Sequence, residues 1–115
     1  MPAVVSETFF AVSVRDMDRA AAFYVAAFGA AVAFQSDEWS SLVIAGVRVG
    51  LALVSDEEAL VPTGLHFAVK DRAEACAAVE RAGGTVIVKQ IEPGGGVVLA
   101  TVADTEGNRI VLVGP

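Results

Sequence analysis

The alternation of apolar and polar residues predicts that the chain opens with a strand and then a helix. Residues 7–14 alternate as a half-buried strand does, which puts two sets of side chains on opposite faces. One face carries Thr8, Phe10, Val12 and Val14, and the other carries Glu7, Phe9, Ala11 and Ser13. Residues 20–28 place apolar side chains at helical spacing, and Gly29 is suited to end this helix. Three segments with strand character follow, over residues 31–35, 39–45 and 47–54.

The second half of the chain repeats this order. Val69-Lys70-Asp71 follows Val14-Arg15-Asp16 by 69 − 14 = 55 residues, and each triplet joins a strand pattern to a helical one. The second copy is predicted to have strands at 64–69, 85–90, 97–102 and 109–113, a helix at 71–82, a flexible loop at 92–96 and a turn at 104–108. Each copy is therefore a β-α-β-β-β unit.

A single unit of this kind cannot bury the apolar face of its own sheet. We therefore expect an α+β fold in which two tandem modules, residues 5–54 and 64–115, form a curved mixed sheet with the helices outside. The 115 residues are enough for one domain, 1–115, and the polar stretch 55–63 links its halves. The concave side of such a sheet is a natural place for a small molecule.

The composition is apolar for a soluble monomer. Hydrophobic residues make up 55% of the chain and charged residues 19%, yet no apolar run reaches the length of a membrane span. The excess of apolar surface favours a subunit interface or a ligand cavity, so we expect a homodimer and no membrane contact.

Charge and cysteine content narrow the partners and the compartment. The formal net charge is −6 and no cluster of Lys and Arg occurs, so nucleic acid is not expected as a partner. The chain shows no pattern of a signal peptide, and its single cysteine, Cys76, excludes an internal disulfide. These features favour the cytoplasm, with Cys76 packed in a helix rather than acting as a catalytic thiol.

Several short motifs resemble those of the vicinal oxygen chelate superfamily, which includes glyoxalase I, extradiol dioxygenases, fosfomycin-resistance transferases and bleomycin-resistance proteins. In the first half they are Val14-Arg15-Asp16-Met17-Asp18-Arg19, Phe23-Tyr24 and Phe28-Gly29. In the second half they are Val69-Lys70-Asp71, Ala82-Gly83-Gly84 and Asp104-Thr105-Glu106-Gly107-Asn108-Arg109-Ile110. The resemblance covers almost the whole chain and implies the glyoxalase/bleomycin-resistance fold, in which short members commonly form homodimers.

In metal-using members of this superfamily, ligands come from the first and last strands of each half. The resemblance places these positions at Phe9 and Gly64 in the first strands, and at Gly50 and Val111 in the last strands. None of these side chains can ligate a metal. We therefore expect no metal ion and no other cofactor, and the chain resembles the bleomycin-resistance-like members that sequester a drug without metal.

Six residues are predicted to line the ligand site. His66, the single histidine, shares a strand face with Gly64 and Ala68, so it is predicted to face the cavity as a hydrogen-bond anchor, a general base or a solvated residue. Glu7 lies on the face of Phe9, where it pairs with His66 or a cationic ligand, or is solvated at the strand end.

The remaining candidates supply apolar surface and a cation. Phe9 lines the cavity, and Trp39 either stacks on a planar ligand or packs in the core or at a dimer contact. Arg109 shares a face with Val111 and holds an anionic group or is solvated, and Arg48 is its equivalent in the first half.

These observations lead to two functional hypotheses. The first is metal-independent binding, and sequestration, of a small planar or aromatic molecule, as in antibiotic-resistance binding proteins. The alternative is a glyoxalase-like lyase, isomerase or dioxygenase that acts in the same cavity, with His66 as the catalytic residue. A module that contacts protein through its sheet is a third class.

Overall fold

The computed structural model describes residues 2, 4–55 and 62–115, so much of the predicted link between the halves lies outside the described residues. The described residues form two helices and eight strands in the predicted order. The elements are β1 (Phe10–Val14), α1 (Met17–Phe28), β2 (Ala31–Gln35), β3 (Trp39–Ile44), β4 (Val47–Leu53), β5 (His66–Ala68), α2 (Arg72–Arg81), β6 (Thr85–Gly94), β7 (Val97–Ala103) and β8 (Arg109–Val113).

The strands form two four-stranded mixed sheets, one in each module. The strand order is β1-β4-β3-β2 in the first sheet and β5-β8-β7-β6 in the second. In each sheet the first strand runs parallel to the last one, and the other pairs are antiparallel. The predicted α+β class and the two repeated β-α-β-β-β modules are therefore confirmed, with the strands divided between two sheets.

Two aspartates at matching positions of the repeat begin the two helices. The Asp16 carboxylate accepts a hydrogen bond from the Arg19 backbone N–H at 3.0 Å, and Asp71 accepts one from that of Glu74 at 3.0 Å. Each satisfies a backbone donor that the first helical turn leaves unpaired. Helix α1 ends at Gly29, whose φ of 66° is left-handed, as its sequence position predicts.

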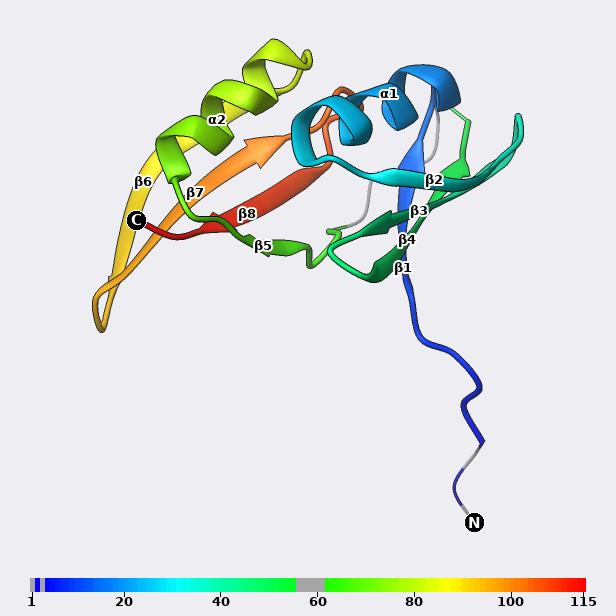
Figure 1. The fold of residues 1–115 in the computed structure, drawn as a ribbon, viewed down its shortest axis with the longest axis horizontal. Coiled ribbons are helices and arrows are strands. Elements are labelled where there is room, and N and C mark those ends of the chain that lie inside the picture. The colour runs from blue at the N-terminus through cyan, green and yellow to red at the C-terminus, as the bar shows by residue number, and fades with distance from the viewer. Residues whose placement is uncertain (1, 3, 56–61) are drawn as a thin grey trace.

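Each helix covers one face of its own sheet, and both helices lie on the same side of the molecule (Figure 1). Val12, Leu42 and Leu51 are fully buried on the helix-covered face of the first sheet, and Ile110 and Leu112 are their counterparts in the second. Neither helix of the described residues covers the opposite faces. The N-terminal residues extend away from the body on this uncovered side (Figure 1).

The two modules of the chain meet through α1, α2 and the turn at residues 104–108. Helices α1 and α2 contact each other, and the buried Tyr24 hydroxyl of α1 donates to the Asp104 carboxylate at 2.7 Å. The Arg19 side chain donates to Glu106 of the same turn at 2.7 Å. Burial raises the pKa of Tyr24, so the phenol keeps its proton and remains a donor.

The predicted loop at 92–96 is wrong in part, because strand β6 continues to Gly94. Ile91 pairs with Leu99 and Gly94 with Val97, with irregular register between these pairs. Strand β6 lies at the edge of its sheet and has no neighbouring strand on its outer side. The missing backbone N–H of Pro93 is tolerated at such an edge. The turn itself is limited to Gly95 and Gly96.

None of the helices in the described part of the chain is both long enough and apolar enough to cross a membrane.

Candidate functional site

The uncovered face of the first sheet carries a compact group of aromatic and charged side chains. The rings of Phe9 and Trp39 meet edge to face, with centroids 6.0 Å apart. The Arg48 guanidinium lies over the Phe9 ring, 4.5 Å from its centroid, and forms an ion pair with Glu7. The Ser41 hydroxyl accepts from Trp39 Nε1 at 3.2 Å and from Arg48 Nε at 3.3 Å. We call these five residues the aromatic–arginine cluster.

The indole of Trp39 lies directly over Gly50. A Cβ atom at position 50 would be 2.1 Å from Cη2 and 2.3 Å from Cζ2 of the indole. Both distances are shorter than a van der Waals contact, so a side chain at position 50 would overlap the indole. Glycine is therefore needed at position 50 for close approach, and not for an unusual backbone angle. Trp39 was predicted to stack on a ligand, to pack in the core or to lie at a dimer contact, and the structure places it half-buried on the uncovered face.

A second group of predicted residues lies on the uncovered face of the second sheet. His66 of β5 pairs in register with Val111 of β8, and Arg109 lies on the same face as Val111. A shallow cavity of about 410 Å³ is lined in part by His66, Arg109, Val111 and Gly64. The predicted faces of strand 64–69 hold, because Leu65 is buried, Phe67 packs on Phe28 with centroids 4.8 Å apart, and His66 is exposed.

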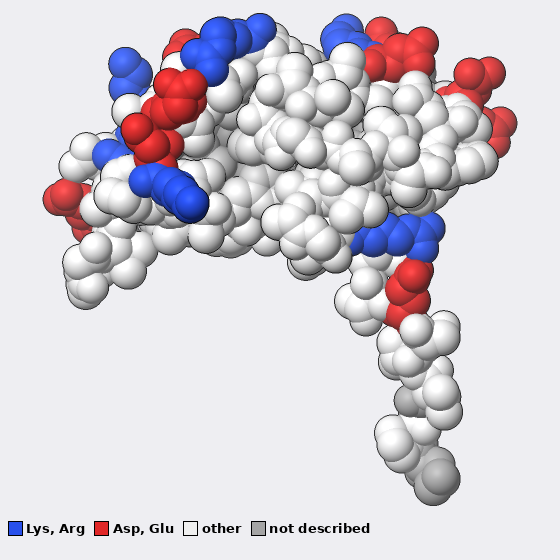
Figure 2. Space-filling model, in the orientation of Figure 1, with Lys and Arg blue, Asp and Glu red and all other residues white. Residues whose placement is uncertain are grey.

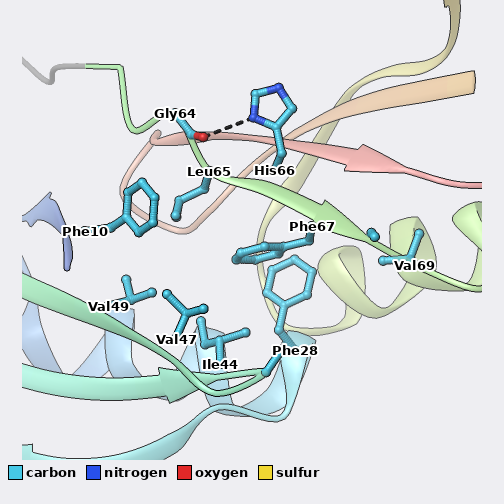
Figure 3. A pocket seen from close by; sticks show the side chains of 12 residues that line it. Phe10, Phe28, Ile44, Val47, Val49, Gly64, Leu65, His66, Phe67 and Val69 are labelled. Carbon is cyan, nitrogen blue, oxygen red and sulfur yellow. Dashed lines mark hydrogen bonds between the residues drawn. The ribbon is translucent and has the colours of Figure 1, made fainter. Parts of the chain in front are cut away.

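His66 has a defined tautomer when its ring is neutral. Its Nδ1 lies 3.0 Å from the carbonyl oxygen of Gly64, which accepts but cannot donate a hydrogen bond. Nδ1 therefore carries the proton and Nε2 carries the lone pair. Figure 3 shows this hydrogen bond and an imidazole that points away from Phe67 and Phe28. The structure does not pair His66 with Glu7, whose carboxylate binds Arg48 instead.

An apolar cleft of about 560 Å³ lies between the modules and was not predicted from the sequence (Figure 3). Residues 64–69 line one side, and Phe10, Phe28 and the β3–β4 hairpin line the other. Phe10 and Val47 are the apolar residues of the sequence that could have indicated this cleft. They remain 43% and 46% exposed, because they line it. The cleft lies beside β1 and β5, whose outer edges have no strand partner among the described residues.

The residues at the superfamily's metal positions do not fit a metal ion. Phe9, Gly64, Gly50 and Val111 offer no donor side chain, and the Trp39 indole fills the space over Gly50. Within residues 2, 4–55 and 62–115, no three His, Cys, Asp or Glu side chains gather as a metal site requires.

Cys76 lies outside both groups. It is 7% exposed in α2, and burial raises the pKa of its thiol, partly offset by Arg72. A thiol that keeps its proton is a weak nucleophile, which agrees with a packing role.

Comparisons with known proteins identify the same two-module fold. The family model of the glyoxalase-like domain matches residues 9–113, so the chain belongs to the glyoxalase-like domain family. The fold is that of the glyoxalase, bleomycin-resistance and dioxygenase proteins, consistent with the vicinal oxygen chelate superfamily. No curated protein matches the chain.

Solved structures share this fold at low sequence identity. A glyoxalase/bleomycin resistance protein/dioxygenase family enzyme from Burkholderia phytofirmans PsJN is 19% identical, with a TM-score of 0.78 over 92% of this chain and 95% of that one. The fosfomycin resistance protein FosX from Listeria monocytogenes is 13% identical, with a TM-score of 0.79 over 98% of this chain and 95% of that one. A glyoxalase/bleomycin resistance protein from Albidiferax ferrireducens T118 is 22% identical, with a TM-score of 0.66 over 96% and 99%.

Proposed function

We propose that this protein binds a small planar or aromatic organic molecule without a metal ion, and sequesters it in the cytoplasm. The observation that carries this proposal is the Trp39 indole over Gly50, with Phe9 edge-on to it. Aromatic surface thus stands where a metal-using relative needs ligands. Offset and edge-to-face contacts between rings favour planar ligands by about 0.5–1.5 kcal/mol beyond the burial of area.

The proposal separates this chain from a structural neighbour. A mutant of FosX is described in complex with manganese(II) and a dihydroxypropylphosphonic acid, so that protein holds both a metal and a phosphonate. The matching positions of this chain lack donors. Sequestration requires tight binding of one state of the ligand and no stabilisation of a transition state. An aromatic face with few titratable groups suits such binding.

We further propose that two copies of the chain associate and that each ligand face is built from both. The predicted site residues lie in two groups on two sheets, and no contact recorded among the described residues joins Phe9 and Trp39 to His66 and Arg109. Unpaired strand edges beside an apolar cleft are a ready surface for another chain. Pairing of β1 with β5 of a second copy would bring the two groups onto one continuous sheet.

The metal-independent reading is tested by elemental mass spectrometry of the purified protein. Samples are compared before and after incubation with manganese, nickel, zinc and iron(II) salts. We expect no stoichiometric metal in any sample. About one metal per chain or per dimer would contradict the proposal and favour a chelate-type lyase or dioxygenase.

Binding is tested through fluorescence, because Trp39 is the one tryptophan of the sequence. Planar aromatic compounds should change its emission, and Phe9→Ala should weaken their binding about 2–10-fold through the lost ring contact. The control is Val25→Ala, because Val25 is an exposed apolar residue of α1 and lies on the other side of the molecule from Phe9. Equal weakening in both variants would contradict a site at Phe9.

A second candidate function is catalysis with His66 as general base. The hydrogen bond from Nδ1 to Gly64 leaves Nε2 as the basic atom on an exposed ring. His66→Ala distinguishes the two functions, since a base contributes typically 10²–10⁴-fold to turnover. A binding protein should instead lose only a modest part of its ligand affinity.

A further inference from the structure

Arg48 is held in one orientation by three neighbours of different chemistry. Its guanidinium lies 4.5 Å from the Phe9 ring centroid, its Nε donates to Ser41, and its Nη1 binds Glu7. Ser41 is 7% exposed and its hydroxyl also accepts from Trp39, so the cation and the indole share one hydrogen-bond acceptor. A planar cation fixed in this way presents its remaining N–H groups in a set direction.

The Arg48 guanidinium keeps donors for a ligand. Its side chain is 37% exposed, and Nη2 forms no hydrogen bond with the described residues. Arginine binds a carboxylate through two parallel N–H···O bonds, a geometry that Glu7 does not use because only its Oε1 contacts Nη1. A ligand carboxylate that approaches from solvent can therefore form the two parallel hydrogen bonds that Glu7 does not form.

Glu7 is suited to leave this position. It precedes β1, which begins at Phe10, and its side chain is 54% exposed. Ion pairs between such exposed groups contribute little to stability and are screened by salt. Glu106 shows the contrast, since its side chain is fully buried and accepts hydrogen bonds from both backbone and side-chain donors.

We propose that Arg48 is the anion-binding residue of the aromatic–arginine cluster, that its ligand is an aromatic carboxylate, and that Glu7 occupies Arg48 in the ligand-free protein as an internal competitor. This inference rests on the proposed function, because it names the chemical class of that ligand. The aromatic ring of the ligand packs on Phe9 and Trp39, and its carboxylate replaces that of Glu7.

The arrangement also selects against other ligands. A cation would be repelled by the Arg48 guanidinium, which lies over the Phe9 ring. A neutral planar molecule would leave Arg48 paired with Glu7. An aliphatic carboxylate would gain the ion pair but not the ring contacts. A ligand with a flat ring and one negative charge at the edge of that ring matches the aromatic side chains of the cluster and its arginine.

Calorimetric titration with two matched probes tests this inference. 2-Naphthoate and 2-naphthamide have the same ring system, and only the first carries a charge. We expect 2-naphthoate to bind wild-type protein about 10-fold or more tightly than 2-naphthamide, as a charge-assisted hydrogen bond requires. Arg48→Gln should remove this difference, and Glu7→Gln should tighten binding of 2-naphthoate alone about 2–5-fold.

A matched pair of variants controls for net charge. Arg81→Gln and Glu74→Gln remove the same charges from an exposed ion pair on α2, where Arg81 Nη2 and Glu74 Oε1 are 2.8 Å apart. These variants should leave the affinity for both probes unchanged. Glu7→Gln alters an exposed residue outside any strand, so it remains informative if Arg48→Gln fails to fold.

The outcomes separate this inference from the proposed function. Equal binding of the two probes, unaffected by Arg48→Gln and Glu7→Gln, would overturn the role of Arg48 while leaving the aromatic site in place. Failure of both probes to bind would overturn the aromatic site and the carboxylate with it. Weaker binding of 2-naphthoate to Glu7→Gln would show that Glu7 assists and does not compete, which also overturns the inference.

Discussion

At the scale of single residues, position 50 decides where the Trp39 indole lies. Phe9 could be placed on the uncovered face from alternation alone, because strand side chains alternate strictly. The stacking of Trp39 on Gly50 could not be predicted, since it depends on the register that sets Ser41 opposite Gly50. The same holds for Arg48, which reaches Phe9 only because β1 and β4 pair in register from Phe10 and Val49.

The first prediction concerns Gly50→Ala. Because the added Cβ would overlap the outer ring of the indole, Trp39 must rotate away from the sheet and lose its contact with Phe9. We expect a shift of tryptophan emission toward longer wavelength and about 10-fold weaker binding of planar ligands. The folded state should lose only about 1–3 kcal/mol, because the overlapping atoms belong to a side chain and not to the backbone.

Emission spectra, ligand titration and urea unfolding measure these three effects. Emission and affinity identical to those of the wild-type protein would contradict the position of the indole over Gly50.

At the scale of elements, the sequence predicts helices and short strands well and long edge strands poorly. Asp16 and Gly29 cap α1 at its two ends, so the presence of this helix follows from the sequence. Strand β6 extends past Pro93 because β7 supplies backbone partners, and no local pattern in residues 92–94 reveals them. Pairing between segments overrides turn-forming residues in this hairpin.

A buried carboxylate of the second module, that of Glu106, binds the start of α1. Glu106 is 1% exposed and accepts hydrogen bonds from the backbone N–H groups of Arg15 and Asp16, at 2.8 and 3.0 Å. It also accepts from the Arg19 and Thr105 side chains. The turn from 104 to 108 thus supplies an acceptor for the start of α1, where helices favour negative charge.

The second prediction is that Glu106→Gln destabilises the folded protein in a pH-dependent way. Burial alone would raise the pKa of Glu106, but hydrogen bonds from Arg19, Arg15, Asp16 and Thr105 bring it below its ordinary value of 4.5. A lowered pKa in the folded state stabilises the protein above pH 4.5, and this contribution is lost as the pH falls through the folded-state pKa. At neutral pH the variant should lose about 1–3 kcal/mol.

Urea unfolding of both proteins at neutral pH and at a series of pH values below 4.5 measures this difference. The gap between wild type and Glu106→Gln should narrow as the pH decreases. Glu80→Gln, on the exposed side of α2, is the control and should change stability little at any pH. A gap that stays constant with pH would contradict the role of the ionised carboxylate.

At the scale of the whole molecule, the sequence predicts the two modules but not their separation into two sheets. The repeat and the apolar faces show that the modules must associate. One continuous sheet and two separate sheets would both satisfy that requirement. In the chain itself the modules meet through the helices and the 104–108 turn, so the outer edges of β1 and β5 stay without a strand partner among the described residues. The predicted site residues are divided for this reason.

The third prediction follows from the proposed association of two copies at these edges. Wild-type protein should have a mass of about 23.6 kDa in light scattering, which is 2 × 11.8 kDa. Phe10→Glu places a charge in the apolar cleft beside β1 and should yield the 11.8 kDa monomer. Val25→Glu is the matched control, because Val25 on α1 is 44% exposed and Phe10 is 43% exposed.

If association completes the ligand face, the monomeric Phe10→Glu variant should also bind planar aromatic ligands more weakly, although Phe10 lies on the opposite side of β1 from Phe9. A wild-type protein that is monomeric at every concentration and still binds ligand would contradict the shared face. The ligand would then contact the first module's aromatic–arginine cluster alone.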